Sequence, residues 1–134
     1  MTRLLLPRPL YEELLKEARQ SLPNECCGLL GGKGEEVHQV FPATNALASP
    51  TAFEVPVPEL IEIFRRLRAL QIDLVGIYHS HPTGDNYPSA RDRERAFYPE
   101  VSYVIVSPRN NAPAPVRAFV LAEGSVKEIS VVVT

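Results

Sequence analysis

Hydrophobic side chains recur at helical spacing in two segments of the chain. In residues 11–22 and again in residues 59–70, apolar positions fall three or four residues apart, with polar positions between them. This spacing places the apolar side chains on one face, so we predict two amphipathic helices over these ranges. A third, shorter helix is expected at residues 89–97, after a loop at residues 80–88 that is rich in proline, glycine and asparagine.

Short apolar runs bounded by turn-forming residues predict strands between and after these helices. The run at residues 73–78 is almost continuously apolar, which indicates a strand that is buried on both faces. The resulting order of elements, α-β-β-α-β-α-β-β-β, predicts an α/β (α+β) fold in which helices flank a mixed sheet. Residues 42–57 contain several prolines and are expected to form a structured loop. The predicted strands span residues 26–30, 36–41, 73–78, 102–107, 115–121 and 126–133.

The composition narrows the class of protein to which the chain can belong. Its 134 residues suit one domain, spanning residues 1–134, with a core of its own. A formal net charge of −2 lacks the basic excess of a general nucleic-acid binder. No apolar run approaches the roughly 20 residues of a membrane span. We therefore expect a cytoplasmic protein whose partners include neither nucleic acid nor a membrane.

The cysteines and the first residues add two further expectations. Cys26 and Cys27 are neighbours whose side chains would point to opposite faces of a strand, so we expect no disulfide between them. The apolar start of the chain hints at a signal peptide, but two prolines follow it at once and keep it far shorter than a secretory apolar region. We therefore predict no targeting segment, and we assign no helix or strand to residues 1–10.

Two histidines and one aspartate have the spacing of a metal site. His79 and His81 lie two residues apart where a predicted strand ends, so both side chains would project from one face with Cβ atoms about 6–7 Å apart. Asp92 lies eleven residues after His81, in the first turn of the third predicted helix. Free backbone N–H groups and the helix dipole support a carboxylate there. Two imidazoles and a carboxylate with an open fourth position are the ligand pattern of a catalytic zinc site.

A zinc hydrolase also needs a base that does not bind the metal, and Glu25 is the best candidate for this role. Glu25 leads directly into the first predicted strand, at residues 26–30. If that strand lies beside the strand that leads to His79, the Glu25 carboxylate can reach a water molecule at the metal.

Together these residues resemble the signature of the JAMM (MPN+) metalloprotease family. That signature is a glutamate, then a distant His-x-His-Pro, six further residues, a serine, two residues and an aspartate. The chain matches every element at the family spacing, with Glu25 and Cys27-Gly28-Leu29-Leu30, then His79-Ser80-His81-Pro82, then Ser89-Ala90-Arg91-Asp92. The intervening loop is similar to that of the small prokaryotic members in carrying Asn45 and Phe53-Glu54.

The resemblance implies a fold, a chemistry and a role for each matched residue. The fold would be the JAMM/MPN architecture, which is cytidine-deaminase-like, and one Zn²⁺ per chain would be bound by His79, His81 and Asp92. Glu25 would act as general base and then general acid, and Ser89 would donate a hydrogen bond to the tetrahedral oxyanion. The implied activity is that of a zinc-dependent peptidase or isopeptidase, deubiquitinase-like, which hydrolyses amide bonds at the C-terminal Gly-Gly tail of ubiquitin-like or sulfur-carrier proteins. Such a carrier would be the partner, and we also consider a homodimer.

The same residues also have plain structural interpretations. His79 and His81 could be two hydrogen-bonded histidines at a strand end, and Glu25 could be a solvated residue at a strand start. Ser89 and Asp92 have the spacing of a capping box, which would make Ser89 a helix cap, and the two roles of Ser89 are compatible.

Other polar residues near the motif favour structural roles. Cys27 lies on the same strand face as the predicted base, but it suits a small buried core residue better than a fourth metal ligand. His38 has no partner at ligand spacing and is expected on the surface of a strand. Tyr87 is either a substrate contact or an exposed loop aromatic. The arginines of the helix at 59–70 suit its exposed face. The later arginines have two possible roles: they could hold an anionic group beside the site, or they could lie on a solvated helix face. These residues are Arg91, Arg93 and Arg95.

Two other functions remain as alternatives. A RadC-like protein associated with DNA repair has a similar His-x-His-Pro-Thr-Gly-Asp-x-x-Pro-Ser stretch, but the net charge and the strand after Glu25 weigh against it. A non-catalytic MPN-type scaffold for protein interaction would usually lack a metal ligand or the glutamate, and this chain keeps both.

Overall fold

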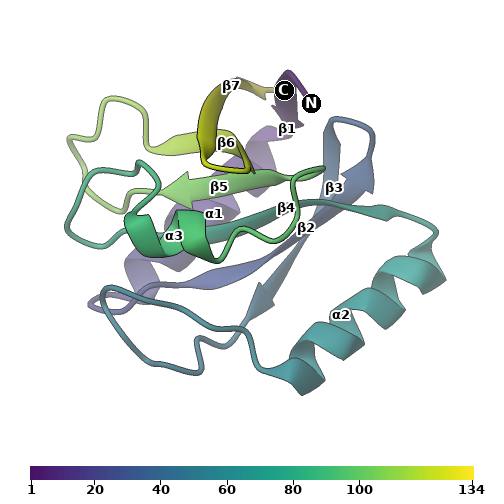
Figure 1. Ribbon diagram of the computed structural model, residues 1–134, viewed down its shortest axis with the longest axis horizontal. Helices are drawn as coiled ribbons and strands as arrows, with labels where there is room; N and C mark the ends of the chain where they lie inside the picture. The colour runs from purple at the N-terminus through teal and green to yellow at the C-terminus, as the bar shows by residue number, and fades with distance from the viewer.

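The computed structural model describes residues 1–134 and contains seven strands in one sheet with three helices (Figure 1). Every helix and strand predicted from the sequence is present, with ends that differ by a few residues. The largest difference is in the third helix, which ends early because the chain after Arg95 turns so that Ala96 and Tyr98 pack against the sheet. The elements are β1 (Arg3–Leu6), α1 (Arg8–Gln20), β2 (Cys27–Lys33), β3 (Glu36–Ala43), α2 (Val57–Leu70), β4 (Asp73–Ser80), α3 (Ala90–Glu94), β5 (Ser102–Val106), β6 (Val116–Ala122) and β7 (Ser125–Val133).

The sheet is mixed, as the sequence predicts, and its strand order is β1-β3-β2-β4-β5-β6-β7. β4 pairs in parallel with β5 and antiparallel with β2, whereas β1 pairs in parallel with both β7 and β3. The pairing of β1 with β3 is limited to Leu5 and Glu36, and it closes the sheet into a barrel. The local sequence pattern does not indicate this closure, because the closing strand lies between partners that are far from each other in the chain.

Strand β1 is an element that the sequence analysis did not assign. Its four residues pair with the end of β7, from Arg3 opposite Ser130 to Leu6 opposite Val133, so the two termini lie close together (Figure 1). Its inward side chains, Leu4 and Leu6, are fully buried. Four residues carry too little periodicity to identify a strand, and this one becomes evident only through its distant partner.

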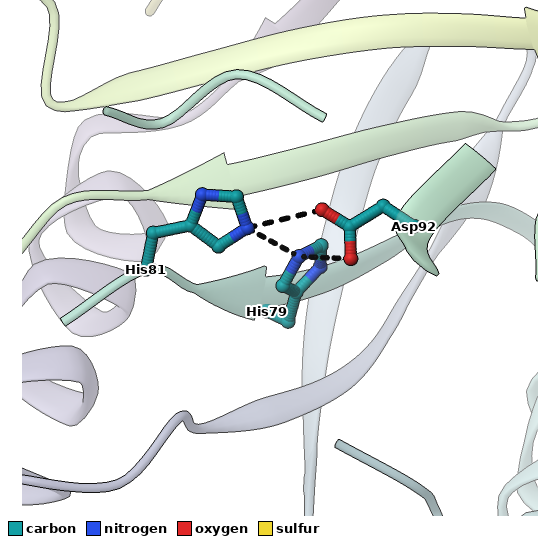
Figure 2. A group of neighbouring side chains, drawn as sticks. All are labelled: His79, His81 and Asp92. Atoms are coloured by element: carbon teal, nitrogen blue, oxygen red, sulfur yellow. Dashed lines mark hydrogen bonds and ion pairs between the residues drawn. The ribbon is translucent and has the colours of Figure 1, made fainter. Parts of the chain in front are cut away.

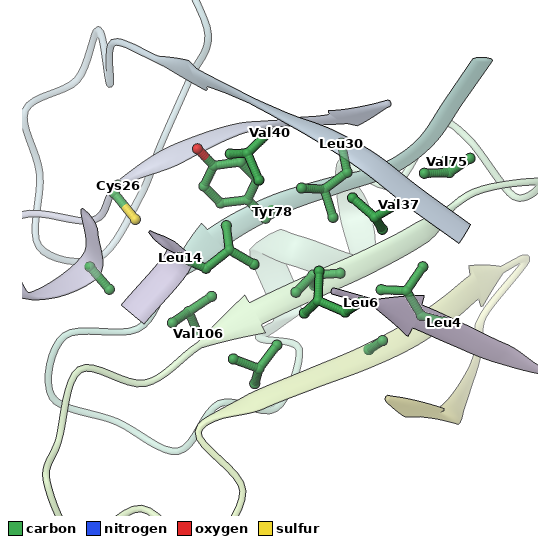
Figure 3. Packing of buried hydrophobic residues seen from close by; sticks show 14 of the residues in the cluster. Leu4, Leu6, Leu14, Cys26, Leu30, Val37, Val40, Val75, Tyr78 and Val106 are labelled. Atoms are coloured by element: carbon green, nitrogen blue, oxygen red, sulfur yellow. The ribbon is translucent and has the colours of Figure 1, made fainter. Parts of the chain in front are cut away.

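Three apolar clusters pack on the two faces of the sheet. The largest joins side chains of all seven strands to the buried face of α1 (Figure 3). The second lies on β5 and β6, and the third joins β2 and β3 to the buried face of α2. β4 supplies Tyr78 to the first cluster and Ile77 to the second, which confirms that this strand is buried on both faces.

Two expectations from composition can be compared directly with this structure. Cys26 and Cys27 are both free and buried, in agreement with the prediction that they do not pair. None of the three helices is both long and apolar enough to cross a membrane.

The antiparallel pairing of β2 with β4 places the predicted site residues side by side. Cys27 lies opposite His79, so the start of β2, directly after Glu25, meets the end of β4. Ser80 ties the two ends together, because its N–H donates to the Cys26 carbonyl (3.1 Å) and its hydroxyl accepts from the Cys26 N–H (2.8 Å). The condition under which Glu25 could approach the histidines is therefore met.

Candidate metal centre

Figure 2 shows the side chains of His79, His81 and Asp92 pointing toward one another. The Nε2 atom of His79 lies 3.1 Å from His81 Nε2 and 3.1 Å from Asp92 Oδ1. The Nε2 atom of His81 lies 3.0 Å from Asp92 Oδ2, and the ligating atoms of all three residues fall within 4.8 Å of one another. The fold thus brings to one point the three residues that the sequence predicts as metal ligands.

The backbone positions each of these side chains. His79 lies near the end of β4, and His81 follows the strand with its N–H donating to the Val106 carbonyl at 3.0 Å. Asp92 is held by the predicted capping box, which is present at the start of α3. The Ser89 hydroxyl accepts from the Asp92 N–H (3.1 Å), and the Ser89 N–H donates to Asp92 Oδ2 (2.9 Å). A helix cap therefore orients the carboxylate toward the histidines.

The donor set and its supports fit a zinc-like divalent ion. Two imidazole nitrogens and a carboxylate are common zinc ligands. His81 directs Nδ1 to the Asp85 carbonyl oxygen at 2.7 Å, and this hydrogen bond selects the tautomer that leaves Nε2 as a metal donor. Phe53 stacks on the His79 ring, with centroids 4.6 Å apart and planes inclined by 21°. The three residues could therefore hold a metal ion with their rings already oriented.

Burial and hydrogen bonds set the charges at the centre. Burial lowers the pKa of His79, which favours the neutral imidazole that metals require. Burial alone would raise the pKa of Asp92, but hydrogen bonds from the two histidines hold it well below its usual range. Burial also opposes protonation of His81, whereas hydrogen bonds to Asp92 and the Asp85 carbonyl raise its pKa. The Asp92 carboxylate thus stays ionised between two imidazoles.

Glu25 is a buried acid beside this centre. It is only 5% exposed, and its Oε1 atom has no hydrogen-bond partner. Burial raises the pKa of Glu25 to about 7, and the charges of His81 and Asp92 act on it more weakly and in opposite directions. The alternative that Glu25 is a solvated residue at a strand start is therefore wrong. A carboxyl group with a pKa near neutrality is suited to accept a proton and to return it.

Two cavities of contrasting chemistry lie at the site residues, one at the metal ligands and the other at Glu25. The first, of about 240 Å³, is lined by His79 and Asp92 together with mainly hydrophobic side chains from the loop at 53–55, from α2 and from residues 97–98. We call it the apolar cavity. The second, of about 300 Å³, is lined by Glu25 and mostly polar residues from the end of α1, the segment before β2 and the loop after β3. We call it the acidic cavity, because Glu17 is its second carboxylic acid.

The structure also decides between several of the open interpretations. Cys27 is fully buried and its thiol points to the carbonyls of Ala43 and Thr44, so it is a core residue. His38 lies on the exposed side of β3, as the sequence predicts, and its Nε2 atom lies 2.9 Å from Glu36 Oε1.

The structure places two groups of residues whose roles the sequence left open. Tyr87 is 44% exposed and packs edge-on against Phe119, with Arg117 above its ring. Of the arginines in and after α3, Arg91 and Arg95 line the apolar cavity, whereas Arg93 is exposed outside it.

Some contributors to the site were not identified from the sequence. The hydroxyl of Ser80 bonds to the start of β2, and the Asp85 carbonyl orients His81. The position of Ser80 between the two histidines was the available signal for the first. The second is a backbone group and has no sequence signal. Glu17 on α1 approaches the site only through the tertiary fold, where its Oε2 accepts from the Tyr78 hydroxyl at 2.6 Å.

The chain is similar to several proteins of bacteria and archaea. It matches the family model of prokaryotic homologues of the JAB domain over residues 7–122. It is 38% identical to a desampylase of Haloferax volcanii over 80% of this chain and 82% of that protein. It is 32% identical to the CysO-cysteine peptidase of Mycobacterium tuberculosis, over 93% of this chain and 87% of that protein. It is 37% identical to a probable TtuB-protein conjugate cleaving protease of Thermus thermophilus, over 97% of this chain and 82% of that protein.

Solved structures have the same fold. A protein of Desulfitobacterium hafniense, determined in solution, is 34% identical and superimposes with a TM-score of 0.85 over 98% of this chain and 92% of its own. A protein described as having a JAMM metalloprotease-like zinc site is 20% identical, with a TM-score of 0.60 over 98% of this chain and 99% of its own. At that identity the second likeness concerns the fold alone.

Proposed function

The chain belongs to the family of prokaryotic homologues of the JAB domain, and from this premise we propose that it is a zinc-dependent hydrolase of amide bonds at the C-terminal Gly-Gly tail of ubiquitin-like or sulfur-carrier proteins. The observation that carries the proposal is the convergence of His79, His81 and Asp92 beside the buried acid Glu25. The names of the relatives support the substrate class, since they refer to desampylation, to a CysO-cysteine peptidase and to cleavage of TtuB–protein conjugates.

In this proposal His79, His81 and Asp92 hold the zinc ion. When bound there, zinc would polarise the scissile carbonyl and lower the pKa of water at the centre. The donor set supports the choice of metal, because two imidazole nitrogens and a carboxylate oxygen are common zinc ligands. The hydrogen bond between His81 and the Asp85 carbonyl supports it further, because ligating histidines usually donate their second N–H to such a group.

Glu25 moves the proton in the proposed reaction. Its carboxylate takes a proton from the attacking water and later gives it to the nitrogen of the leaving amine. The buried position raises the pKa of Glu25 to about 7, which suits both transfers, and general acid–base catalysis of this kind contributes about 10²–10⁴-fold. The absence of a partner for Oε1 leaves this oxygen available for the transferred proton.

Ser89 stabilises the oxyanion in the proposed reaction. Its hydroxyl oxygen accepts from the Asp92 N–H, so the hydroxyl hydrogen is not used in the helix cap and remains available to donate. One donor of this kind contributes about 10²–10³-fold to the rate. The structural and the catalytic interpretation of Ser89 are thus compatible.

The apolar cavity is suited to the acyl half of the substrate. It adjoins the metal ligands His79 and Asp92, and its walls are mainly aromatic and aliphatic. Glycines at the end of the carrier tail pass through a narrow space beside the metal, and a hydrophobic residue upstream of them would fill this cavity.

A metal analysis combined with a cleavage assay tests the proposed function. We expect purified protein to contain one zinc ion per chain and to release the carrier from a Gly-Gly fusion, as measured by mass spectrometry. A chelator should stop cleavage, and added zinc should restore it. The Asp92→Ala variant, which removes one ligand and the cap partner of Ser89, should neither retain zinc nor cleave. Zinc-loaded protein that cleaves no Gly-Gly fusion or conjugate would favour the non-catalytic scaffold instead.

A further inference from the structure

Asn86 is a buried polar residue that the proposed reaction leaves without a role. It is only 3% exposed, although the other residues between 83 and 87 are all exposed. Building on the proposed function, which places zinc on two histidines and an aspartate, we infer that Asn86 is a positioning residue of the metal centre. It fixes the Asp85 carbonyl against His81 and thereby raises the affinity of the centre for zinc.

His81 is the ligand whose ring depends on an outer hydrogen bond. Figure 2 shows its Nε2 atom facing His79 and Asp92, with the other ring nitrogen turned away from Asp92. That nitrogen, Nδ1, lies 2.7 Å from the Asp85 carbonyl oxygen, whereas His79 Nδ1 is buried without a hydrogen-bond partner. A bond of this kind orients the imidazole and raises its basicity toward a metal. Displacement of the Asp85 carbonyl therefore weakens the centre at His81.

The Asp85 carbonyl is held in place by the residue that follows it. The side-chain amide of Asn86 donates to the Ala114 carbonyl at 2.7 Å and to the Ile105 carbonyl at 3.3 Å. The planar peptide group between residues 85 and 86 contains the Asp85 carbonyl, so the anchoring of Asn86 fixes the direction of that carbonyl. Removal of the amide leaves both acceptors without this donor and frees the peptide group to rotate.

The anchor joins the loop to the same strand that positions His81. The Val106 carbonyl accepts from the His81 N–H at 3.0 Å, and the neighbouring Ile105 carbonyl accepts from Asn86. The backbone of β5 thus holds both the residue that carries the imidazole and the segment whose carbonyl faces it. The 2.7 Å separation between these two groups is therefore set by one strand.

The other contacts of this loop are less suited to such a role. Arg117 lies 3.5 Å from Asp85 Oδ1, and the Asp85 side chain is 73% exposed, so water screens this ion pair. Tyr87 packs edge-on against Phe119 but remains 44% exposed. Loss of a buried donor that serves two carbonyls is the costlier change, which assigns the positioning to Asn86.

The zinc affinity of the Asn86→Ala variant tests the inference. Affinity is measured on the full chain by competition with a chelating dye, at a temperature where circular dichroism shows each protein to be folded. Loss of a group that supports a metal ligand typically weakens metal binding 10–100-fold, and since Asn86 acts through one further residue we expect about tenfold. Asn111→Ala is the matched control, because it removes the same amide from an exposed turn between β5 and β6, and it should keep the wild-type affinity.

The outcomes separate this inference from the proposed function. Wild-type affinity in Asn86→Ala would refute the positioning role and leave the proposed function intact, whereas a wild type that binds no zinc would refute the proposed function. The His81 Nδ1–H signal in NMR spectra of zinc-loaded protein adds a readout that a purely structural role would not change. We expect its proton to exchange with solvent at least about tenfold faster in Asn86→Ala than in Asn111→Ala, and equal exchange rates would also count against the inference.

A measurement on the wild type alone keeps the inference testable even if Asn86→Ala does not fold. If the closed anchor favours zinc, zinc must favour the closed anchor by the same factor. The side-chain amide protons of Asn86 are buried and exchange when the loop opens locally, which we expect to be faster than exchange of the backbone amides of β7. Zinc should slow the exchange of the Asn86 protons about tenfold, and exchange that is the same with and without zinc would overturn the inference.

Discussion

Replacing Glu17 with glutamine should make the protein more stable at alkaline pH and remove part of its pH dependence. Burial raises the pKa of Glu17 to about 7 in the folded protein, against 4.5 for an ordinary glutamate, with the Tyr78 hydrogen bond acting in the opposite direction. The folded state therefore binds this proton more tightly than the unfolded state. The free energy of unfolding must fall as the pH rises from about 4.5 to about 7 and then level off.

The size of the effect follows from the shift in pKa. A difference of about 2.5 units corresponds to about 3 kcal/mol at 1.36 kcal/mol per unit. Water screens the partly exposed Glu17 side chain, so we expect about 1–2 kcal/mol to be measurable. Glutamine has nearly the same shape and still accepts from Tyr78, so Glu17→Gln removes the ionisation without opening a gap.

The assay is urea denaturation of chelator-treated wild type and Glu17→Gln at several pH values between 4.5 and 8. Because Glu25 titrates in both proteins, its contribution cancels in the difference between them. We expect the two free energies of unfolding to be similar at pH 4.5, and the variant to be more stable by about 1–2 kcal/mol at pH 8. A difference that does not change with pH, or a variant that becomes less stable as the pH rises, would refute the account of Glu17.

Three further predictions concern the centre and the sheet. Glu25→Gln should keep zinc, as measured by elemental analysis, and reduce kcat by at least about 100-fold, because the proton acceptor is lost; loss of zinc would mean that Glu25 has another role. Asp92→Ala should lose zinc, whereas treatment of the wild type with a chelator should leave a cooperative thermal transition, since the apolar clusters do not include the ligands; unfolding on chelation would make the centre structural. Gly28→Ala should destabilise the protein by about 1–3 kcal/mol in urea denaturation, because the new Cβ would lie 2.5 Å from the Phe41 carbonyl oxygen. Gly84→Ala has open space around it and should change little, so equal stability of the two glycine variants would contradict the packing argument.

Local signals in the sequence were enough for most helices and strands. The helix at 59–70 follows from apolar side chains at helical spacing, and the structure has α2 at Val57–Leu70. The strand predicted at 73–78 is the core of β4, at Asp73–Ser80. Such patterns depend on neighbours within a few residues, which a sequence displays directly.

The metal centre could be anticipated for the same reason. His79 and His81 are placed by the period of a strand, and Asp92 by the first turn of the helix that Ser89 caps. Each of these placements is local. Glu25 is far from the histidines in the sequence, so its proximity to them in space required a further assumption, namely that β2 lies beside β4. The structure has that pairing.

The sequence by itself therefore determined the order of the elements from α1 to β7 and the spacing of the metal ligands. Tertiary structure decided that β1 closes the barrel between β7 and β3, and that Glu17 shares a cavity with Glu25. It also decided how deeply Glu25 is buried, and hence that its pKa lies near 7 rather than near 4.5. These features arise from contacts between segments that are distant in the sequence. The free energy of such contacts depends on packing and desolvation, and the contacts produce no periodic pattern of residues from which they could be predicted.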